Sequence, residues 1–461
     1  MFPYFCFSLL SVICISGEPV KSIPGWTDPL RSDWYSGYLE GSSPSRQLAY
    51  VFVESENDPA NSPVVYWANG GPGCSSFIGF WLEQGPLRMG GDGTLSENIG
   101  RWNKNTNVLF LESPPGVGFS YVQGGAPPYA ANDTSTAADN VAALENFFAL
   151  FPAFGGSPLW LAGESYAGVY VPWTARAVLN NGSAALAARL RRGGILVGNG
   201  ALHTDGTYES LLAEQRMAHA HGHGLFSSAL RAQIDAACTS YTNRSAACNA
   251  LLEQYPAEMG PLNNYNIQDT CLGRGVGAQQ AALLRAEGSS PALLARAEAG
   301  LASLRENICT EFDDAVTSYM NLSSVVSAFH FEAGSAVQGA WKECAGRDTL
   351  VYTIIPDNEM TDVYPVLLQS MRVLVYNGDN DECIPYGHDE KWTSDMGYPV
   401  KEPWRPWLLD NQVAGYVTEF GGTGGGRFTF ATVKMAGHEV PFYQPARALA
   451  LFERFIAGQP L

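Results

Sequence analysis

The chain has 461 residues, 46% of them hydrophobic, which is ample for a large core and too many for a single small domain. Its formal net charge at pH 7 is −18, and no basic run or patch indicates a nucleic-acid partner. This acidic balance is typical of a soluble protein that keeps its net charge low in an acidic compartment.

The chain begins with an almost wholly apolar stretch, residues 2–15, followed by the small residues Ser16 and Gly17. This stretch is too short to cross a bilayer as a helix, so we predict a cleaved signal peptide over residues 1–17. It departs from the usual pattern because its start carries no Lys or Arg, and a short buried segment is the alternative. No later run of eighteen or more apolar residues occurs, so we expect no membrane anchor.

Two further features favour export through the secretory pathway. Four Asn-x-Ser/Thr triplets are candidate glycosylation sites, at Asn132, Asn181, Asn243 and Asn321. Seven cysteines remain after removal of the signal peptide, so three disulfides and one free thiol form the simplest arrangement in an oxidising compartment. The spacing alone does not fix which cysteines pair.

Strand-like patterns recur along the chain. Residues 35–40 and 48–54 alternate around a turn at 41–44, which predicts an antiparallel hairpin. Short apolar runs typical of buried strands follow at 64–68, 107–111, 159–162, 195–198, 373–376 and 428–433. Helical patterns lie between or after them, as at 140–151, 169–179 and 445–456. This alternation predicts an α/β fold, with a mostly parallel central sheet and helices on both faces.

A long central stretch has a different texture. Between residues 205 and 345 strand-like runs nearly vanish, and Ala, Leu, Arg and Glu dominate at helical spacing. Four cysteines lie inside it, Cys238, Cys248, Cys271 and Cys309. We predict an inserted helical cap domain, 205–345, pinned by disulfides, between two parts of a core, 18–204 and 346–461. Residues 278–304 are either a surface helical excursion or a segment removed by proteolysis.

The sequence Gly163-Glu164-Ser165-Tyr166-Ala167-Gly168 contains the pattern G-x-S-x-G. An apolar run enters it and a helical segment leaves it, so Ser165 is predicted on a tight strand-to-helix turn with its hydroxyl above the sheet. The helix N-terminus beneath favours developing negative charge. A buried turn serine is the alternative.

Three other strand ends carry polar or glycine-rich sequences, and ligands gather at the carboxyl ends of parallel strands. Residues 69–76 read Asn-Gly-Gly-Pro-Gly-Cys-Ser-Ser, whose backbone N–H groups suit an oxyanion, although an ordinary turn is the alternative. Residues 377–382 supply acidic side chains, and residues 437–441 supply a histidine. Serine, aspartate and histidine thus occur in the chain order of an α/β-hydrolase.

These motifs together resemble the serine carboxypeptidases, acid exopeptidases of vacuoles, lysosomes and secretions. The resemblance rests on Trp67-Ala-Asn-Gly-Gly-Pro-Gly-Cys-Ser-Ser76, Gly163-Glu-Ser-Tyr-Ala-Gly168, Gly378-Asp-Asn-Asp381 and Gly437-His-Glu-Val-Pro441. It runs from about residue 23 to the C-terminus, insertion included. It implies the α/β-hydrolase fold and a catalytic triad of Ser165, Asp381 (rather than Asp379) and His438.

The resemblance also implies the other roles in the site. The backbone N–H groups of Gly71 and Tyr166 would form the oxyanion hole. The terminal carboxylate of the substrate would be held by Asn69, Gly70, Glu83 and Glu164. Glu439 would face the pocket for the departing residue and favour basic C-terminal residues beside apolar ones.

The disulfides that the resemblance implies are Cys74–Cys344, Cys238–Cys248 and Cys271–Cys309, with Cys383 free. Two residues depart from the family pattern. Ala68 stands where a larger apolar residue is usual, which concerns packing. Cys383 lies two residues after Asp381 rather than three, which argues against a direct thiol contact with substrate and favours a buried, unreactive cysteine.

Two other patterns look functional but favour a simpler interpretation. His219, His221 and His223 alternate, but no carboxylate or cysteine pattern beside them completes a metal site, and we expect neither metal nor cofactor. The glycine-rich stretch 421–426 lacks the Lys-Ser/Thr of a phosphate loop and is predicted to be a hairpin turn.

The sequence therefore predicts a secreted, vacuolar or lysosomal serine carboxypeptidase that releases single C-terminal residues from peptides and proteins at acid pH through an acyl-enzyme. An acyltransferase on the same scaffold and a catalytically idle protective or binding protein are the alternatives. The oligomeric state is left open, with a homodimer as one option.

Overall fold

The computed structural model describes residues 17–202, 208–269, 311–355, 359–422, 424 and 426–461. All but the last residue of the predicted signal peptide therefore lies outside the described residues.

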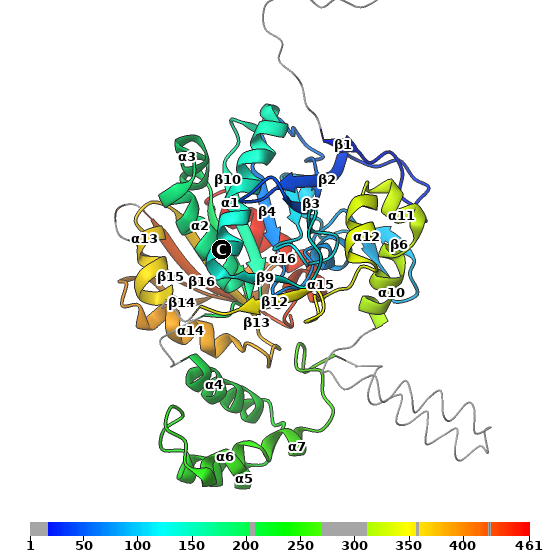
Figure 1. Ribbon diagram of the computed structural model, residues 1–461. Helices are drawn as coiled ribbons and strands as arrows, with labels where there is room; N and C mark the ends of the chain where they lie inside the picture. Colours follow the sequence, from blue (N-terminus) through cyan, green and yellow to red (C-terminus); the bar gives the residue numbers. More distant parts are fainter. Residues whose placement is uncertain (1–16, 203–207, 270–310, 356–358, 423, 425) are drawn as a thin grey trace, which may run out of the picture.

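A 12-stranded mixed sheet runs through the centre of the molecule (Figure 1). Its strands, in spatial order, are β1 (Glu18–Pro19), β2 (Trp34–Glu40), β3 (Arg46–Val53), β7 (Asn107–Leu111), β4 (Val64–Ala68), β10 (Leu159–Glu164), β11 (Gly194–Gly198), β13 (Arg372–Gly378), β16 (Arg427–Val433), β15 (Gln412–Gly421) and β14 (Val400–Leu409), with β8 (Tyr121–Val122) paired to β3.

The middle of the sheet is parallel and its two ends are antiparallel. Strands β7, β4, β10, β11, β13 and β16 pair in parallel, and all six were expected from short apolar runs. The register aligns Gly163 with Ala68 and Glu164 with Gly198, so these strands end at one edge. The sequence segments that follow them therefore meet at that edge, which is where the candidate site is built.

Alternate residues of each central strand face opposite layers of helices. On β4, for example, Tyr66 packs into one core cluster and Trp67 into the other, and both are almost completely buried. Strands that are covered on both faces have continuous apolar sequences, which explains why short apolar runs predicted them. Burying each such large side chain stabilises the fold by about 1.5–3 kcal/mol.

One layer of helices packs on the core cluster that contains Tyr66. It consists of α1 (Asp133–Leu150), η3 (Pro152–Phe154), α2 (Ala167–Asn181), α3 (Ala184–Arg192), α13 (Tyr364–Leu367) with η5 (Glu359–Val363) before it, and α14 (Tyr386–Asp395). Helix α1 begins seven residues before the predicted start at residue 140, because the Asn132 side chain accepts from the Ser135 N–H and the Ser135 hydroxyl bonds the Asn132 N–H. This capping box provides hydrogen-bond partners for backbone N–H groups at the start of the helix. The spacing of apolar residues, from which the helix was predicted, did not reveal this earlier start.

The opposite layer packs on the cluster that contains Trp67. It consists of η1 (Gly79–Glu83), η2 (Trp102–Lys104), α10 (Glu311–Met320), α11 (Ser323–Ala328), α15 (Val440–Tyr443) and α16 (Pro445–Ile456), with α12 (Glu332–Gln338) following α11. Phe452 of α16 stacks on Trp102 with ring centroids 4.0 Å apart. The predicted cap range thus includes α10 to α12, of which α10 and α11 pack against the main sheet.

The first four helices of the insertion form a small unit with its own core, drawn in green at the bottom of Figure 1. Its helices are α4 (Tyr208–Gly222), α5 (Ser228–Ala237), α6 (Ala246–Leu252) and α7 (Tyr255–Met259). Its own core includes Met217 and Ile234 and is closed by the disulfide Cys238–Cys248. A small core of this kind gains from such a covalent constraint.

Several strands were not expected from the sequence. Two small sheets pair β5 (Leu87–Met89) with β6 (Leu95–Glu97) and β9 (Tyr129–Asn132) with β12 (Leu350–Thr353). At the sheet edge, β14 is mostly exposed and contains Pro403 and Pro406, so it lacks the apolar pattern of a buried strand. Strands β15 and β16 pair antiparallel on either side of the glycine-rich stretch 421–426, as expected for a hairpin, with Gly421 opposite Arg427.

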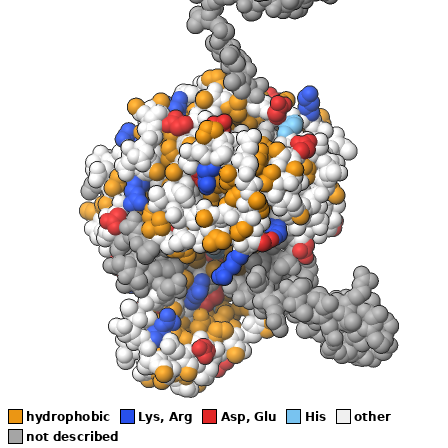
Figure 2. Space-filling view, in the orientation of Figure 1, with side chains coloured by type: hydrophobic (Ala, Val, Ile, Leu, Met, Phe, Trp, Pro, Cys, Tyr) orange, Lys and Arg blue, Asp and Glu red, His pale blue; other side chains and the backbone are white. Residues whose placement is uncertain are grey.

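Among the described residues, no helix combines the length and apolarity needed to cross a membrane. The face drawn in Figure 2 has Lys and Arg side chains interspersed with Asp and Glu.

Candidate active site

Ser165 lies on a sharp turn between β10 and α2. Its backbone φ is +59°, a left-handed conformation that a serine adopts at a cost of about 1–2 kcal/mol. The turn is held by hydrogen bonds, since the Ser165 N–H donates to the Gly198 carbonyl (3.0 Å) and the Ser165 carbonyl accepts from the N–H groups of Gly168 and Ala201 (both 2.8 Å). A Cβ on Gly168 would lie 2.2 Å from the Ala201 carbonyl oxygen, so only glycine fits there. This is the strained strand-to-helix turn that the sequence predicted.

The predicted histidine and aspartate form a buried pair. His438 Nδ1 lies 2.7 Å from Oδ2 of Asp381, and the two side chains are 1% and 0% exposed. Backbone N–H groups of Cys383 (2.7 Å) and Ile384 (3.2 Å) also donate to the Asp381 carboxyl group. These contacts fix the aspartate, which in turn orients the imidazole and stabilises its charged form.

Asn199 is a member of this network that sequence reasoning missed. Its Nδ2 donates to Oδ2 of Asp381 (2.8 Å), and its Oδ1 accepts from the Gly378 N–H (2.9 Å). It directly follows β11 at the functional edge of the sheet, with a backbone φ of +40°. Its position after an apolar strand was the available signal, but Gly198-Asn199-Gly200 has the composition of an ordinary turn.

The electrostatic surroundings of His438 favour its protonated form. Burial lowers its pKa, but the negative charge and hydrogen bond of Asp381 outweigh burial, so the pKa of His438 is raised above its usual value. Its Nε2 atom is buried and has no hydrogen-bond partner among the described residues. The Tyr265 ring packs edge-on against the imidazole at 4.5 Å, and the Tyr265 carbonyl accepts from the His438 N–H (2.7 Å).

The glycine-rich loop lies directly against the serine. A Cβ on Gly70 would be 2.4 Å from the Tyr166 backbone nitrogen and 2.8 Å from Cβ of Ser165. Gly71 has a φ of +108°, a conformation that favours glycine. The disulfide Cys74–Cys344 anchors the far end of the loop. The structure thus brings Gly70, which directly precedes Gly71, against the backbone of Tyr166 and the side chain of Ser165. The oxyanion-hole role of the Gly71 and Tyr166 N–H groups stays a prediction.

Two buried glutamates face a single amide beside this loop. Nδ2 of Asn69 donates to Oε1 of Glu83 (3.0 Å) and to Oε1 of Glu164 (2.7 Å). Oδ1 of Asn69 accepts from the Trp67 indole (2.7 Å) and the Gly79 N–H (3.1 Å), which fixes the amide with its nitrogen toward the glutamates. All three predicted carboxylate-binding side chains are therefore in one cluster, at most 5% exposed.

The glutamate pair is set up to hold protons. Burial raises the pKa of Glu83 to about 7, although hydrogen bonds from Asn69 and Glu164 partly oppose it. Burial and then the charge of Glu83 raise the pKa of Glu164 well above its usual value. Apart from the contact between the two carboxyl groups themselves, Oε2 of each glutamate is buried and accepts no hydrogen bond from the described residues. Such a pair can donate hydrogen bonds to an anion while protonated.

Comparison with known proteins identifies the family. The model of the serine carboxypeptidase family matches residues 24–458. The chain belongs to the serine carboxypeptidase family. Serine carboxypeptidase 1 of Hordeum vulgare is 33% identical over 484 residues, which cover 96% of this chain and 93% of that protein. The lysosomal protective protein of Mus musculus is 35% identical over 473 residues, covering 96% and 94%.

The fold agrees with this assignment. The structure of Kex1(Δ)p, a prohormone-processing carboxypeptidase from Saccharomyces cerevisiae, matches with a TM-score of 0.69 at 20% identity, covering 97% of this chain and 95% of that one. This serine carboxypeptidase therefore has the α/β-hydrolase fold that the motifs predicted, and it is a hydrolase of the serine type.

In this serine carboxypeptidase, Glu439 and Cys383 lie next to two of the predicted triad residues, His438 and Asp381. Glu439 is partly buried, and its charge helps to raise the pKa values of Glu164 and His438, which places it near both. Burial raises the pKa of Cys383 to about 12, so its sulfur is a thiol rather than a nucleophilic thiolate. Arg216 of α4 donates to the Cys383 carbonyl (2.8 Å).

The remaining site predictions have mixed outcomes. The disulfides Cys74–Cys344 and Cys238–Cys248 are formed, whereas Cys271–Cys309 lies outside the described residues. Asn181 and Asn243 are exposed, and Asn132 is partly exposed as the cap of α1.

Asn321 differs from the other glycosylation candidates. Its Nδ2 donates to the carbonyls of Thr317 (2.8 Å) and Trp341 (2.9 Å), so both amide hydrogens are used, and a glycan would replace one of them. This arrangement disfavours Asn321 as an acceptor in the folded chain.

The three alternating histidines do not converge on one point. His219 and His223 lie with ring centroids 4.4 Å apart, while His221 contacts Ser228 (3.3 Å). Within the described ranges, no group of three His, Cys, Asp or Glu side chains could hold a metal ion.

Proposed function

We propose that this serine carboxypeptidase removes single residues from the C-termini of peptides and proteins at acid pH, through an acyl-enzyme on Ser165. The observation that carries the proposal is the Asn69–Glu83–Glu164 cluster beside Ser165. A carboxylate-binding cluster beside the nucleophile accepts a chain end and disfavours an internal peptide bond. The cluster therefore supports exopeptidase rather than endopeptidase action.

In the proposed acylation step, the three residues of the triad act in turn. Oγ of Ser165 attacks the carbonyl carbon of the last peptide bond, and its proton passes to Nε2 of His438. Asp381 stabilises the resulting imidazolium through the 2.7 Å hydrogen bond. Negative charge on the carbonyl oxygen is stabilised by the N–H groups of Gly71 and Tyr166. The C–N bond then breaks, and His438 returns the proton to the amine of the departing amino acid.

Deacylation repeats the same steps with water. His438 accepts a proton from water, whose oxygen attacks the ester carbonyl on Ser165. The ester bond breaks, the proton returns to Ser165, and the shortened peptide leaves with a new C-terminal carboxylate. The atoms and charges balance without any metal or cofactor.

Acid pH follows from the glutamate pair. Protonated Glu83 and Glu164 donate hydrogen bonds to the substrate carboxylate, whereas ionised ones repel it. Since the pKa of Glu83 is about 7 and that of Glu164 is raised well above its usual value, binding is strong at acid pH and weakens toward neutral pH. The raised pKa of His438 has the opposite effect on turnover, which falls at low pH because a protonated imidazole cannot accept the serine proton.

The leaving residue is proposed to lie near Glu439. An anion at this position attracts a Lys or Arg side chain, while the tyrosine rings nearby suit apolar ones. Tyr265 and Tyr443 are both in the electrostatic field of Glu439, which raises their pKa values in addition to burial. This supports acceptance of both basic and apolar C-terminal residues.

The proposed location is the secretory pathway, with a vacuole, lysosome or the extracellular space as destination. The predicted signal peptide, the glycosylation triplets and the two disulfides support it. One similar protein, that of Mus musculus, is named a lysosomal protective protein.

Two experiments test the proposal against its alternatives. A fluorophosphonate probe followed by peptide mapping should modify Ser165, whereas an idle binding protein would leave it unmodified. A panel of blocked dipeptides and sugar esters should show release of amino acids from the dipeptides. Acyl transfer from sugar esters to alcohols, without peptide cleavage, would favour the acyltransferase alternative.

A further inference from the structure

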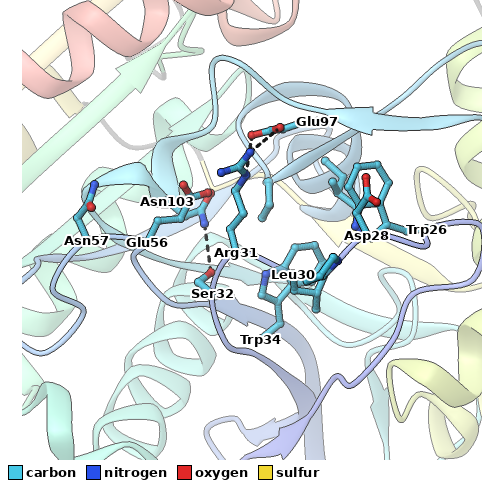
Figure 3. A pocket seen from close by; sticks show the side chains of 13 residues that line it. Trp26, Asp28, Leu30, Arg31, Ser32, Trp34, Glu56, Asn57, Glu97 and Asn103 are labelled. Carbon is cyan, nitrogen blue, oxygen red and sulfur yellow. Dashed lines mark hydrogen bonds and ion pairs between the residues drawn. The ribbon is translucent and has the colours of Figure 1, made fainter.

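A cavity of about 690 Å³ lies apart from the candidate active site (Figure 3). It is formed by the segment that leads into β2, the residues after β3, the β5–β6 pair and η2. None of its lining residues belongs to the triad, the oxyanion loop or the carboxylate cluster. Its size is in the range of small-molecule sites, which are about 300–1,000 Å³.

One part of the cavity wall is aromatic and aliphatic. Trp26 and Trp34 line it together with Leu30, and Figure 3 shows Leu30 next to Trp34 with Trp26 beyond. Trp34 is 2% exposed and is held edge-on by Phe80 at 5.5 Å, so this wall is rigid. Trp26 is partly exposed and supplies the accessible indole surface of this wall, and such flat surfaces suit the C–H face of a ring.

The other part of the wall contains Arg31, Glu97 and Glu56, which are joined into one chain of ion pairs through Arg101, a residue that does not itself line the cavity. Arg31 Nε lies 2.7 Å from Glu97, which also lies 3.0 Å from Nη1 of Arg101. Arg101 in turn makes a double hydrogen bond to Glu56, at 2.5 and 2.9 Å. The charges along this chain compensate one another, so a charged ligand would have to break existing pairs. A neutral ligand can instead form hydrogen bonds with the guanidinium and carboxylate groups without breaking these ion pairs.

Two buried polar atoms on lining residues have no partner among the described residues. They are the indole Nε1 of Trp26, a donor, and Oδ1 of Asn103, an acceptor. Asn103 is 1% exposed, and its Nδ2 is already directed to Ser32 and the Glu54 carbonyl at 3.4 Å each. A hydroxyl group suits either atom as a partner, because a hydroxyl both donates and accepts.

We infer that this cavity binds a neutral pyranose sugar, as a terminal hexose of a glycan or in a free oligosaccharide. The indole wall takes the C–H face of the ring, and the ion-pair chain with Asn103 and the Trp26 N–H takes its hydroxyl groups. Sugar binding here does not require the peptidase reaction, because the lining residues are separate from the candidate active site.

Isothermal titration of the whole enzyme with neutral methyl glycosides tests the inference. The probes are methyl α-D-mannopyranoside, methyl β-D-glucopyranoside and methyl N-acetyl-β-D-glucosaminide, with sorbitol and glucose 6-phosphate as acyclic and charged controls. At least one glycoside should bind with a Kd on the order of 1 mM. The controls should bind at least about tenfold more weakly.

Matched tryptophan variants locate the site. Trp26→Ala should weaken glycoside binding about tenfold or more, while Trp404→Ala, an exposed tryptophan on β14, should not change it. Peptidase activity should persist in both variants and reports that they fold. Repeating the titration after enzymatic removal of glycans distinguishes two sources, because binding seen only then means that a glycan of the enzyme itself occupies the cavity.

Three results would overturn the inference. The first is an absence of glycoside binding up to about 50 mM with glycans removed. The second is equal binding by the Trp26→Ala and Trp404→Ala proteins. The third is tighter binding of glucose 6-phosphate than of any neutral glycoside, which would show a site for anions.

Discussion

Glu83 and Glu164 come from a π-helix and a central strand, yet their buried carboxyl groups meet at one amide nitrogen, Nδ2 of Asn69, at 3.0 and 2.7 Å. Two carboxyl groups this close cannot both ionise without strong repulsion, and their titration belongs to the pair. The pH dependence of substrate binding is therefore the clearest consequence of the structure.

Replacing both glutamates should flatten the pH profile of KM. In the natural enzyme, KM for a blocked dipeptide should rise from about pH 6 upward, since the pair loses protons through the pKa of Glu83, about 7. The Glu83→Gln, Glu164→Gln double variant cannot lose these protons, so its KM should stay level across that range. Steady-state kinetics from pH 4 to 8 measures this.

An ester substrate without a free carboxylate is the control for this prediction. Its turnover should persist to higher pH in both proteins, because it makes no use of the glutamate pair. A level KM for dipeptides in the natural enzyme would show that the pair does not hold the substrate carboxylate.

Glu382 should make the fold less stable as pH rises. Burial raises its pKa from 4.5 to about 9, and neither carboxyl oxygen has a hydrogen-bond partner among the described residues. Between these two values the folded chain binds more protons than the unfolded chain, so the free energy of unfolding falls with increasing pH. Glu382→Gln removes this dependence and should lose less stability between about pH 5 and 8.

Thermal unfolding at several pH values measures the effect. The exposed Glu390→Gln on α14 is the matched control and should follow the natural protein. If the Glu382 and Glu390 variants lose Tm equally as pH rises, Glu382 is not neutral in the fold.

Glu439→Gln should change the preference for the leaving residue. Loss of the anion should reduce release of C-terminal Arg relative to Leu, by roughly threefold to tenfold for a partly exposed charge pair of about 0.7–1.4 kcal/mol. The measurement is the ratio of kcat/KM for two blocked dipeptides that differ only in the last residue, with Glu390→Gln as control. An unchanged ratio would remove Glu439 from the pocket.

Asn199 should act as a positioning residue for the aspartate. Losing its hydrogen bond to a charged carboxylate should cost about 1.5–3 kcal/mol and lower kcat on the order of tenfold to a hundredfold. Asn199→Gly keeps the positive φ accessible while removing the amide, and KM should change little. A normal kcat in a variant with normal Tm would show that Asp381 needs no support from Asn199.

A site residue could be predicted from the sequence when it follows a buried strand. Ser165, Asp381 and His438 lie at or shortly after the ends of buried strands, and polar or glycine-rich residues after an apolar run can be recognised in a sequence. Glu83 had no such signal, because it ends a π-helix inside the buried stretch 77–84, and only the resemblance to a known family pointed to it.

Other features depend on contacts between distant segments, which local patterns do not contain. The early start of α1 required the Asn132 cap, and the exposed edge strand β14 lacks alternation because only one of its residues is buried. The cavity beside Trp26 is assembled from segments that lie far apart in the chain, up to Asn103. Such features are set by tertiary packing rather than by propensity or spacing.

The central claim, catalysis through an acyl-enzyme on Ser165, is tested most directly by kcat for release of the last residue of a blocked dipeptide by Ser165→Ala, at about pH 5. We predict a decrease on the order of 10⁴-fold or more with an unchanged Tm, because the triad acts as a unit and loses its nucleophile. A folded Ser165→Ala protein that keeps most of its activity would contradict the assignment of Ser165 as the nucleophile.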